Sequence, residues 1–107
     1  MSRRPATSHA YRTFALMATA VVSLVGCGPV SYAVDISSAE DIVSEARAEN
    51  ADYYAPYELH FAEAQLTKAR EEAAEGHFED ALEMVSVAKA YGRRALERSA
   101  RPGERAQ

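Results

Sequence analysis

Two long segments of the chain repeat apolar residues at alternating intervals of three and four positions. The first segment carries Leu59, Ala62, Leu66, Ala69 and Ala73. The second carries Phe78, Ala81, Val85, Ala88, Gly92 and Ala95. This period places each set on one face of an α-helix, and the Gly76-His77 pair between them is typical of a helix stop and a tight turn. The pattern predicts an all-α fold built on an antiparallel helical hairpin.

The hairpin seam is made largely of small residues, which let two helix backbones approach closely but bury little apolar area. We expect its first helix to begin at Pro56, because proline suits the first turn of a helix, and its second helix to end near Arg98. A domain of this size has a slim stability margin. We therefore expect a third layer, supplied either by a preceding helix or by another chain.

The region before the hairpin predicts one short helix. Ser37 and Ser38 are N-cap candidates with carboxylates three residues further on, which is a capping-box arrangement. We expect this helix to end near Glu49, and Asn50 to Ala55 to break the helical pattern, since a residue before proline avoids helical backbone. The Gly, Pro and Ser residues of 28–35 indicate a connector, and 99–107 indicates a disordered tail.

The amino-terminal segment has the pattern of a secretory signal. Residues 1–26 carry three arginines and no carboxylate, whereas the rest of the chain carries nine basic and sixteen acidic side chains. An apolar run from Phe14 to Val25 follows the basic start. As a helix it would span ~18 Å, well short of the ~30 Å hydrocarbon core of a bilayer. The segment therefore indicates a signal peptide rather than a permanent membrane span.

Residues Leu24-Val25-Gly26-Cys27 resemble the lipobox of bacterial lipoproteins. The resemblance implies cleavage between Gly26 and Cys27 and attachment of a diacylglycerol to the thiol. Cys27 is the only cysteine of the chain, so an internal disulfide cannot account for it. An ordinary signal peptide that happens to contain a cysteine, or an uncleaved anchor, is the alternative. The predicted organisation is a signal peptide (1–26), a lipidated cysteine and connector (27–35), a helical domain (36–98) and the tail (99–107).

The histidines and tyrosines are the first candidates for chemistry or binding. His60 and Glu63 share a helix face, but His77 lies a helix length away. The sequence places no third ligand near either group, so we expect surface histidines and no metal site. Nothing in the sequence marks a nucleophile with a partner base. Tyr53, Tyr54 and Tyr57 are candidates for partner contact, with packing over the open end of the hairpin as the alternative.

A cluster of arginines makes the carboxyl-terminal end basic. Arg93, Arg94 and Arg98 are candidates for contact with an anionic surface, either lipid or cell-wall polymer. The alternative is a favourable interaction with the negative end of the last helix.

Several of these features resemble one family of bacterial envelope proteins. The Ala55-Pro56 helix opening, the Gly76-His77-Phe78 turn, Ala81 and Ala88 are similar to those of the domain of unknown function 4398, over residues 36 to 98. The family implies small helical lipoproteins without an assigned activity, some of which also carry a peptidoglycan-binding domain. The turn is also similar to one tetratricopeptide unit, but such arrays need about three repeats and no second copy is present.

These observations predict a non-enzymatic, lipid-anchored envelope protein whose helical domain binds a protein partner or a second copy. The alternative is a structural component that associates with the cell wall or with lipid through its basic end. Gly28 after the lipidated cysteine favours the outer membrane, facing the periplasm. We expect no cofactor beyond the lipid on Cys27, no small-molecule substrate, and no nucleic acid.

Overall fold

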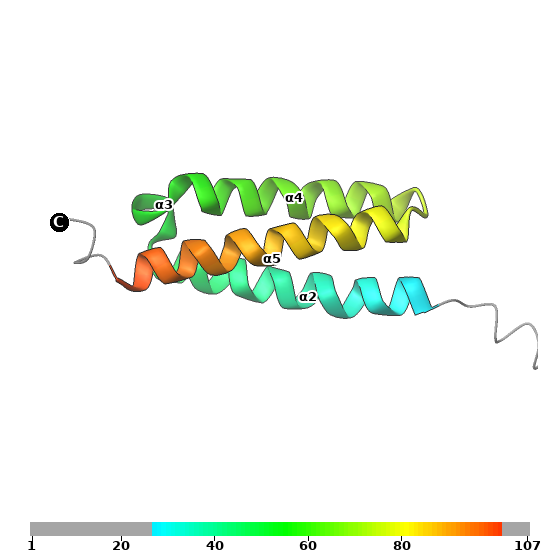
Figure 1. The fold of residues 1–107 in the computed structure, drawn as a ribbon, viewed down its shortest axis with the longest axis horizontal. Coiled ribbons are helices and arrows are strands. Elements are labelled where there is room, and N and C mark those ends of the chain that lie inside the picture. The colour runs from blue at the N-terminus through cyan, green and yellow to red at the C-terminus, as the bar shows by residue number, and fades with distance from the viewer. Residues whose placement is uncertain (1–26, 102–107) are drawn as a thin grey trace, which may run out of the picture.

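The computed structural model describes residues 27–101, and its regular elements are all helices. They are α2 (Cys27–Ala48), α3 (Ala51–Tyr54), α4 (Pro56–Ala74) and α5 (Phe78–Ala100). The three long helices lie side by side as an up-down-up bundle, and α3 closes one end (Figure 1). Over residues 27–101, none of the helices combines the length and hydropathy that a membrane crossing requires. The predicted all-α class is confirmed.

The predicted hairpin is formed by α4 and α5. Gly76 adopts a φ of 86°, in the left-handed region that favours glycine. The Gly76 N–H donates to the Ala73 carbonyl at 3.0 Å, and the His77 N–H donates to the Glu72 carbonyl at 2.9 Å. This pair of bonds is a Schellman motif, which satisfies the last carbonyls of α4. The turn therefore ends α4 and lets α5 begin at Phe78.

Helix α5 lies between its two partners and packs along both α4 and α2, whereas α2 and α4 touch over a much smaller area. Alanines make up most of the core, and Leu59 and Val85 are its largest fully buried side chains. Gly92, which the sequence pattern assigned to the α4–α5 seam, faces α2 instead: a Cβ atom there would lie 3.0 Å from Cγ2 of Ile42. The bundle thus has two close-packed seams, one on each side of α5.

Helix α2 corrects the prediction of a short helix after a connector. It begins at Cys27 and includes residues 28–35, so the N-cap expected at Ser37 or Ser38 is wrong. Tyr32 and Ile36 are partly buried against the core, and Nζ of Lys89 donates to Asp35 at 2.6 Å. These contacts stabilise a helix that the Gly, Pro and Ser residues would not form alone. The third layer that the small core needs is therefore α2.

The two other predicted boundaries also change. The break at Asn50 to Ala55 is present, with Asn50 at a φ of 61°, but it contains the single turn α3. Helix α5 continues beyond Arg98 to Ala100, so the predicted tail begins too early. Ser99 is buried, and its hydroxyl donates to the Ala95 carbonyl at 2.7 Å. Residues 1–26 and 102–107, with the predicted signal peptide and the rest of the tail, lie outside the described residues.

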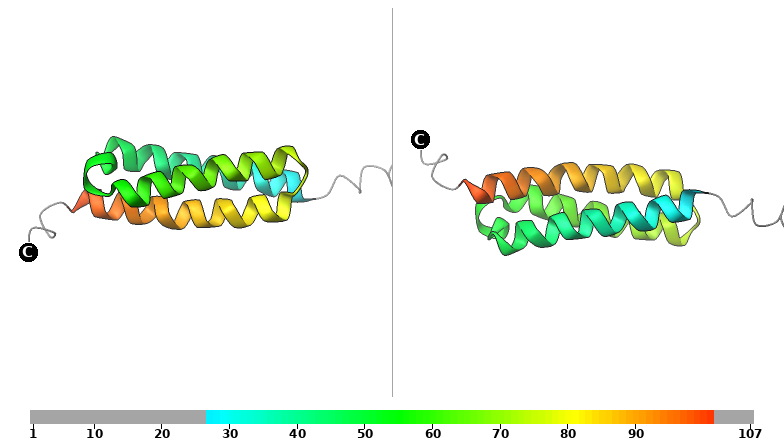
Figure 2. Two further views of the ribbon diagram at one scale, coloured as in Figure 1. Left: turned by 90° about the horizontal axis from the view of Figure 1, so that it is seen from above. Right: turned by 90° about the horizontal axis from the view of Figure 1, so that it is seen from below.

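The bundle has two distinct ends. The start of α2 and the turn between α4 and α5 lie together at one end, and α3 and the last turn of α5 lie at the other (Figures 1 and 2). Gly28 packs against Phe78 at the first of these ends, since a Cβ atom on Gly28 would lie 3.4 Å from the Phe78 side chain. The starts of α2 and α5 are therefore in contact. A helix of this length spans ~33 Å. Cys27 is thus separated from α3 by the full length of the bundle.

Candidate functional site

Aromatic side chains gather toward the α3 end of the bundle. Tyr53 and Tyr54, on α3, meet edge to face with ring centroids 5.0 Å apart. Tyr53 is 78% exposed, the most exposed of the large apolar side chains in the described chain. Packing within the hairpin therefore does not account for Tyr53.

Tyr57 joins a second aromatic group, which spans α4 and α5. Its ring stacks on Phe61 at a centroid distance of 6.0 Å, and Phe61 meets Tyr91 of α5 at 4.3 Å. The guanidinium of Arg94 lies over the Tyr91 ring, 4.8 Å from its centroid. Tyr57 itself remains 66% exposed. We call Tyr57, Phe61, Tyr91 and Arg94 the aromatic surface.

Tyr57 and Arg94 are among the contact residues predicted from the sequence, whereas Phe61 and Tyr91 are not. The four-residue spacing of Tyr57 and Phe61 could have indicated that pair, because such residues are neighbours on a helix. Tyr91 could be found only from the way α5 packs on α4. The three predicted tyrosines therefore belong to two groups, Tyr53 with Tyr54 and Tyr57 with the aromatic surface.

The predicted arginine site is divided in the structure. Arg98 forms an ion pair with Glu58, a carboxylate that is only 7% exposed. A carboxylate removed from water needs such a partner, so Arg98 joins α5 to α4 and keeps the Glu58 charge from being buried alone. Arg94 belongs to the aromatic surface, and Arg93 is exposed. Two of the three arginines thus have contacts within the bundle.

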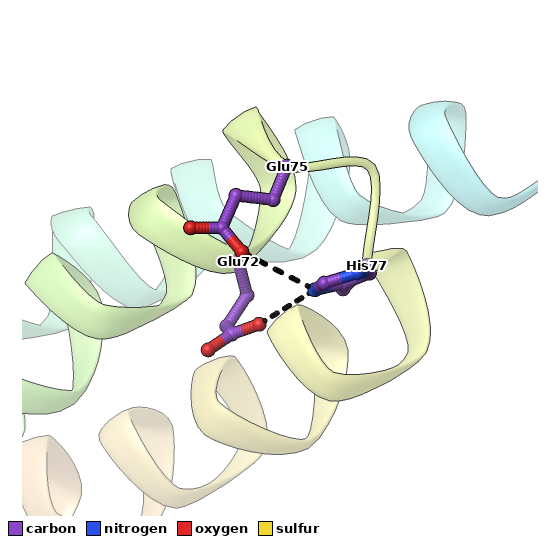
Figure 3. Close-up of side chains that lie close together, drawn as sticks. All are labelled: Glu72, Glu75 and His77. Carbon is purple, nitrogen blue, oxygen red and sulfur yellow. Dashed lines mark hydrogen bonds and ion pairs between the residues drawn. The ribbon is translucent and has the colours of Figure 1, made fainter.

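His77 has two carboxylates beside it, contrary to the expectation that no further ligand lies near it. Its Nδ1 is 3.0 Å from Oε2 of Glu72 and 3.6 Å from Oε2 of Glu75 (Figure 3). The hydrogen bond with Glu72 raises the pKa of His77 above its ordinary value. The ligand atoms of these three residues lie within 4.8 Å of one another. Among the described residues, this cluster is the one with the spacing to hold a divalent cation.

Electrostatics accounts for the same geometry without a metal. The last turn of α4 has no basic residue, and carboxylates at the negative end of a helix repel it. A protonated His77 offsets that repulsion. The other predicted pair, His60 with Glu63, is 3.3 Å apart, and Glu63 is also held by Arg47. Neither histidine therefore requires a metal to explain its position.

A shallow groove of about 310 Å³ runs between α2 and α4. Val43 and Leu66 form part of its apolar wall. Two ion pairs cross it: Arg47 with Glu63, and Arg70 with Glu40 at 2.5 Å. The hydroxyl of Thr67, another lining residue, donates to the Glu63 carbonyl at 3.1 Å. The charged side chains that line the groove are thus paired with one another across it.

Cys27 is the first residue of α2, and its side chain is exposed as a free thiol. The position leaves the sulfur accessible for covalent modification without disturbing the core.

The fold and these surfaces define a small all-helical bundle with an exposed aromatic end. A comparison with known protein families finds that the domain of unknown function DUF4398 matches residues 34–107. The chain belongs to this family, as its hairpin motifs suggested. No curated protein and no solved structure matches the chain.

Proposed function

We propose that the protein is an envelope lipoprotein, anchored through a lipid on Cys27, whose bundle is a non-catalytic module that binds another protein. The basic start, the short apolar run and the Leu24-Val25-Gly26-Cys27 motif support the anchor. The exposed position of Cys27 at the first turn of α2 is compatible with it. Gly28 after the cysteine supports an outer-membrane address that faces the periplasm.

The observation that carries the binding role is the exposure of tyrosines near one end of the helical bundle. Tyr53 and Tyr57 leave 78% and 66% of their surface in solvent, although neighbouring aromatic rings pack together. Tyrosine and arginine are enriched among the residues that dominate protein interfaces. The aromatic surface and the Tyr53–Tyr54 pair are thus the surfaces offered to a protein partner or to a second copy.

The second candidate is a structural role at the cell wall or the lipid surface through Arg93, Arg94 and Arg98. Arg98 is paired with Glu58, so its positive charge is partly neutralised within the bundle and attracts an external anionic polymer less strongly. The arginines also lie near the end of α5 that is remote from Cys27 (Figure 1). Ionic attraction is screened over ~8 Å at physiological salt, far less than the ~33 Å length of a helix like α2. Within this second candidate, the wall is therefore favoured over the anchoring membrane.

Crosslinking in intact envelopes separates the two candidates. The full chain with Tyr57→Ala should lose its crosslinked protein adduct while it keeps its helicity, and Glu45→Ala, an exposed change on α2, should keep both. Wall or lipid association through the basic end would instead be weakened by Arg93→Gln, which leaves the aromatic surface unchanged, and it would weaken with salt. A chain with both Tyr53→Ala and Tyr57→Ala that keeps every adduct would contradict the binding role.

A further inference from the structure

The start of α2 carries two large apolar side chains that the bundle leaves uncovered. Val30 is 64% exposed and Val34 is 66% exposed. Successive residues of a helix turn by ~100°, so Cys27, Val30 and Val34 lie within ~60° on one stripe. Residues 27–34 contain no charged side chain. An exposed, uncharged stripe thus begins at the cysteine and continues for two turns.

Beyond Val34, the same stripe of α2 becomes charged. Its next charged members are Asp41 and Glu45, and both are exposed. Carboxylates are costly in contact with hydrocarbon. Only the first two turns of α2 are therefore suited to an apolar surface.

We propose that Val30 and Val34 rest on the lipid surface, so that the bundle is tilted with the first two turns of α2 against the membrane, the α4–α5 turn slightly farther from it, and α3 remote from it. This inference rests on the lipid attachment proposed above. Cys27 is itself part of α2, so no connector separates the acyl chains from the bundle. A lipid on its sulfur therefore brings the stripe that begins there to the interface.

Charged residues at the α4–α5 turn restrict the orientation of the bundle on the membrane. Glu72, Glu75 and His77 are near the same end as Cys27, and Glu75 is exposed. Carboxylates there favour water over the interior of the bilayer. The apolar contact is thus confined to the first two turns of α2, and α3 with its tyrosines lies at the far end of the tilted bundle, in the aqueous space.

Depth-dependent quenching tests this arrangement with the full lipidated chain. In that chain the Cys27 thiol is occupied, so a fluorophore can be attached to Val34→Cys, Ala74→Cys or the matched control Asp52→Cys on α3. The samples are phosphatidylcholine vesicles with a nitroxide on the headgroup. We expect strong quenching at 34, weaker quenching at 74, and none at 52. Val34→Glu should reduce the quenching at 74 while the chain stays attached to the vesicles.

Each contrary outcome has a distinct meaning. Equal quenching at all three positions shows a bundle lying flat and overturns the orientation alone. Loss of quenching at 34 with a doubled mass shows that a second copy covers the stripe, and also overturns it. Intact mass without a lipid, together with failure to float with vesicles, overturns the proposed anchor itself.

Discussion

Substitution of Gly92 tests how closely α2 packs on α5. A Cβ atom at this position would lie 3.0 Å from Cγ2 of Ile42 and 3.3 Å from Cγ2 of Val43. Gly92→Ala gains ~1 kcal/mol of helix propensity, but overpacking of a close seam typically costs ~1–3 kcal/mol. The two effects give a net loss of ~0–2 kcal/mol of unfolding free energy. Gly92→Leu adds three further carbons to the same contact and should cost more than Gly92→Ala.

The assay is urea unfolding followed by circular dichroism, on the chain from residue 27 with serine in place of the cysteine. Ala90, which is exposed on the same helix, supplies the control. Ala90→Gly removes the helix propensity without touching the seam, so it should cost ~1 kcal/mol. If Gly92→Ala instead stabilised the chain by the full propensity difference, the close approach of α2 and α5 would be refuted.

Three further predictions concern buried and ionised groups. Ala88→Glu buries an unpaired charge at a fully buried position, which should abolish most of the helical circular dichroism, whereas Ala90→Glu should not. Arg98→Gln leaves the buried Glu58 carboxylate without its partner and should lower the denaturation midpoint, measured against Arg93→Gln at an exposed position of α5. The pKa of His77 is raised in the folded state, so its contribution to stability is complete below about pH 6 and is lost as the pH rises through the folded pKa. His77→Gln should therefore lower Tm in mild acid and have little effect in alkali. An equal loss of Tm at both pH values would refute the ion pairs of His77 with Glu72 and Glu75.

The hairpin could be predicted from the sequence because its determinants are local. The spacing of apolar residues in α4 and α5 and the glycine between them specify two helices and a turn, and Gly76 takes the backbone conformation that the pattern indicated. The first turns of α2 could not be predicted in this way. Gly28 has poor helix propensity, and the contacts that hold this segment come from distant residues, such as Phe78 against Tyr32.

The candidate site shows the same division between local and distant contacts. Tyr53 and Tyr54 are adjacent in sequence, so their proximity follows from the chain itself. Tyr91 is far from Phe61 in the sequence, and it becomes part of the aromatic surface only because α5 packs on α4. The carboxylates beside His77 were also missed. The Schellman turn folds His77 back toward the last turn of α4, where Glu72 lies.

The most direct test of the account is the intact mass of the chain purified from the membrane fraction of its host. The proposed lipid anchor predicts an amino terminus at Cys27, a diacylglyceryl group on the sulfur of that residue, and no trace of residues 1–26. It also predicts that Cys27→Ala blocks this modification and leaves a soluble or unprocessed protein, since acyl chains anchor by ~0.8 kcal/mol per buried methylene. A mature chain that begins elsewhere, or a Cys27→Ala chain that stays in the membrane with wild-type mobility, would contradict it.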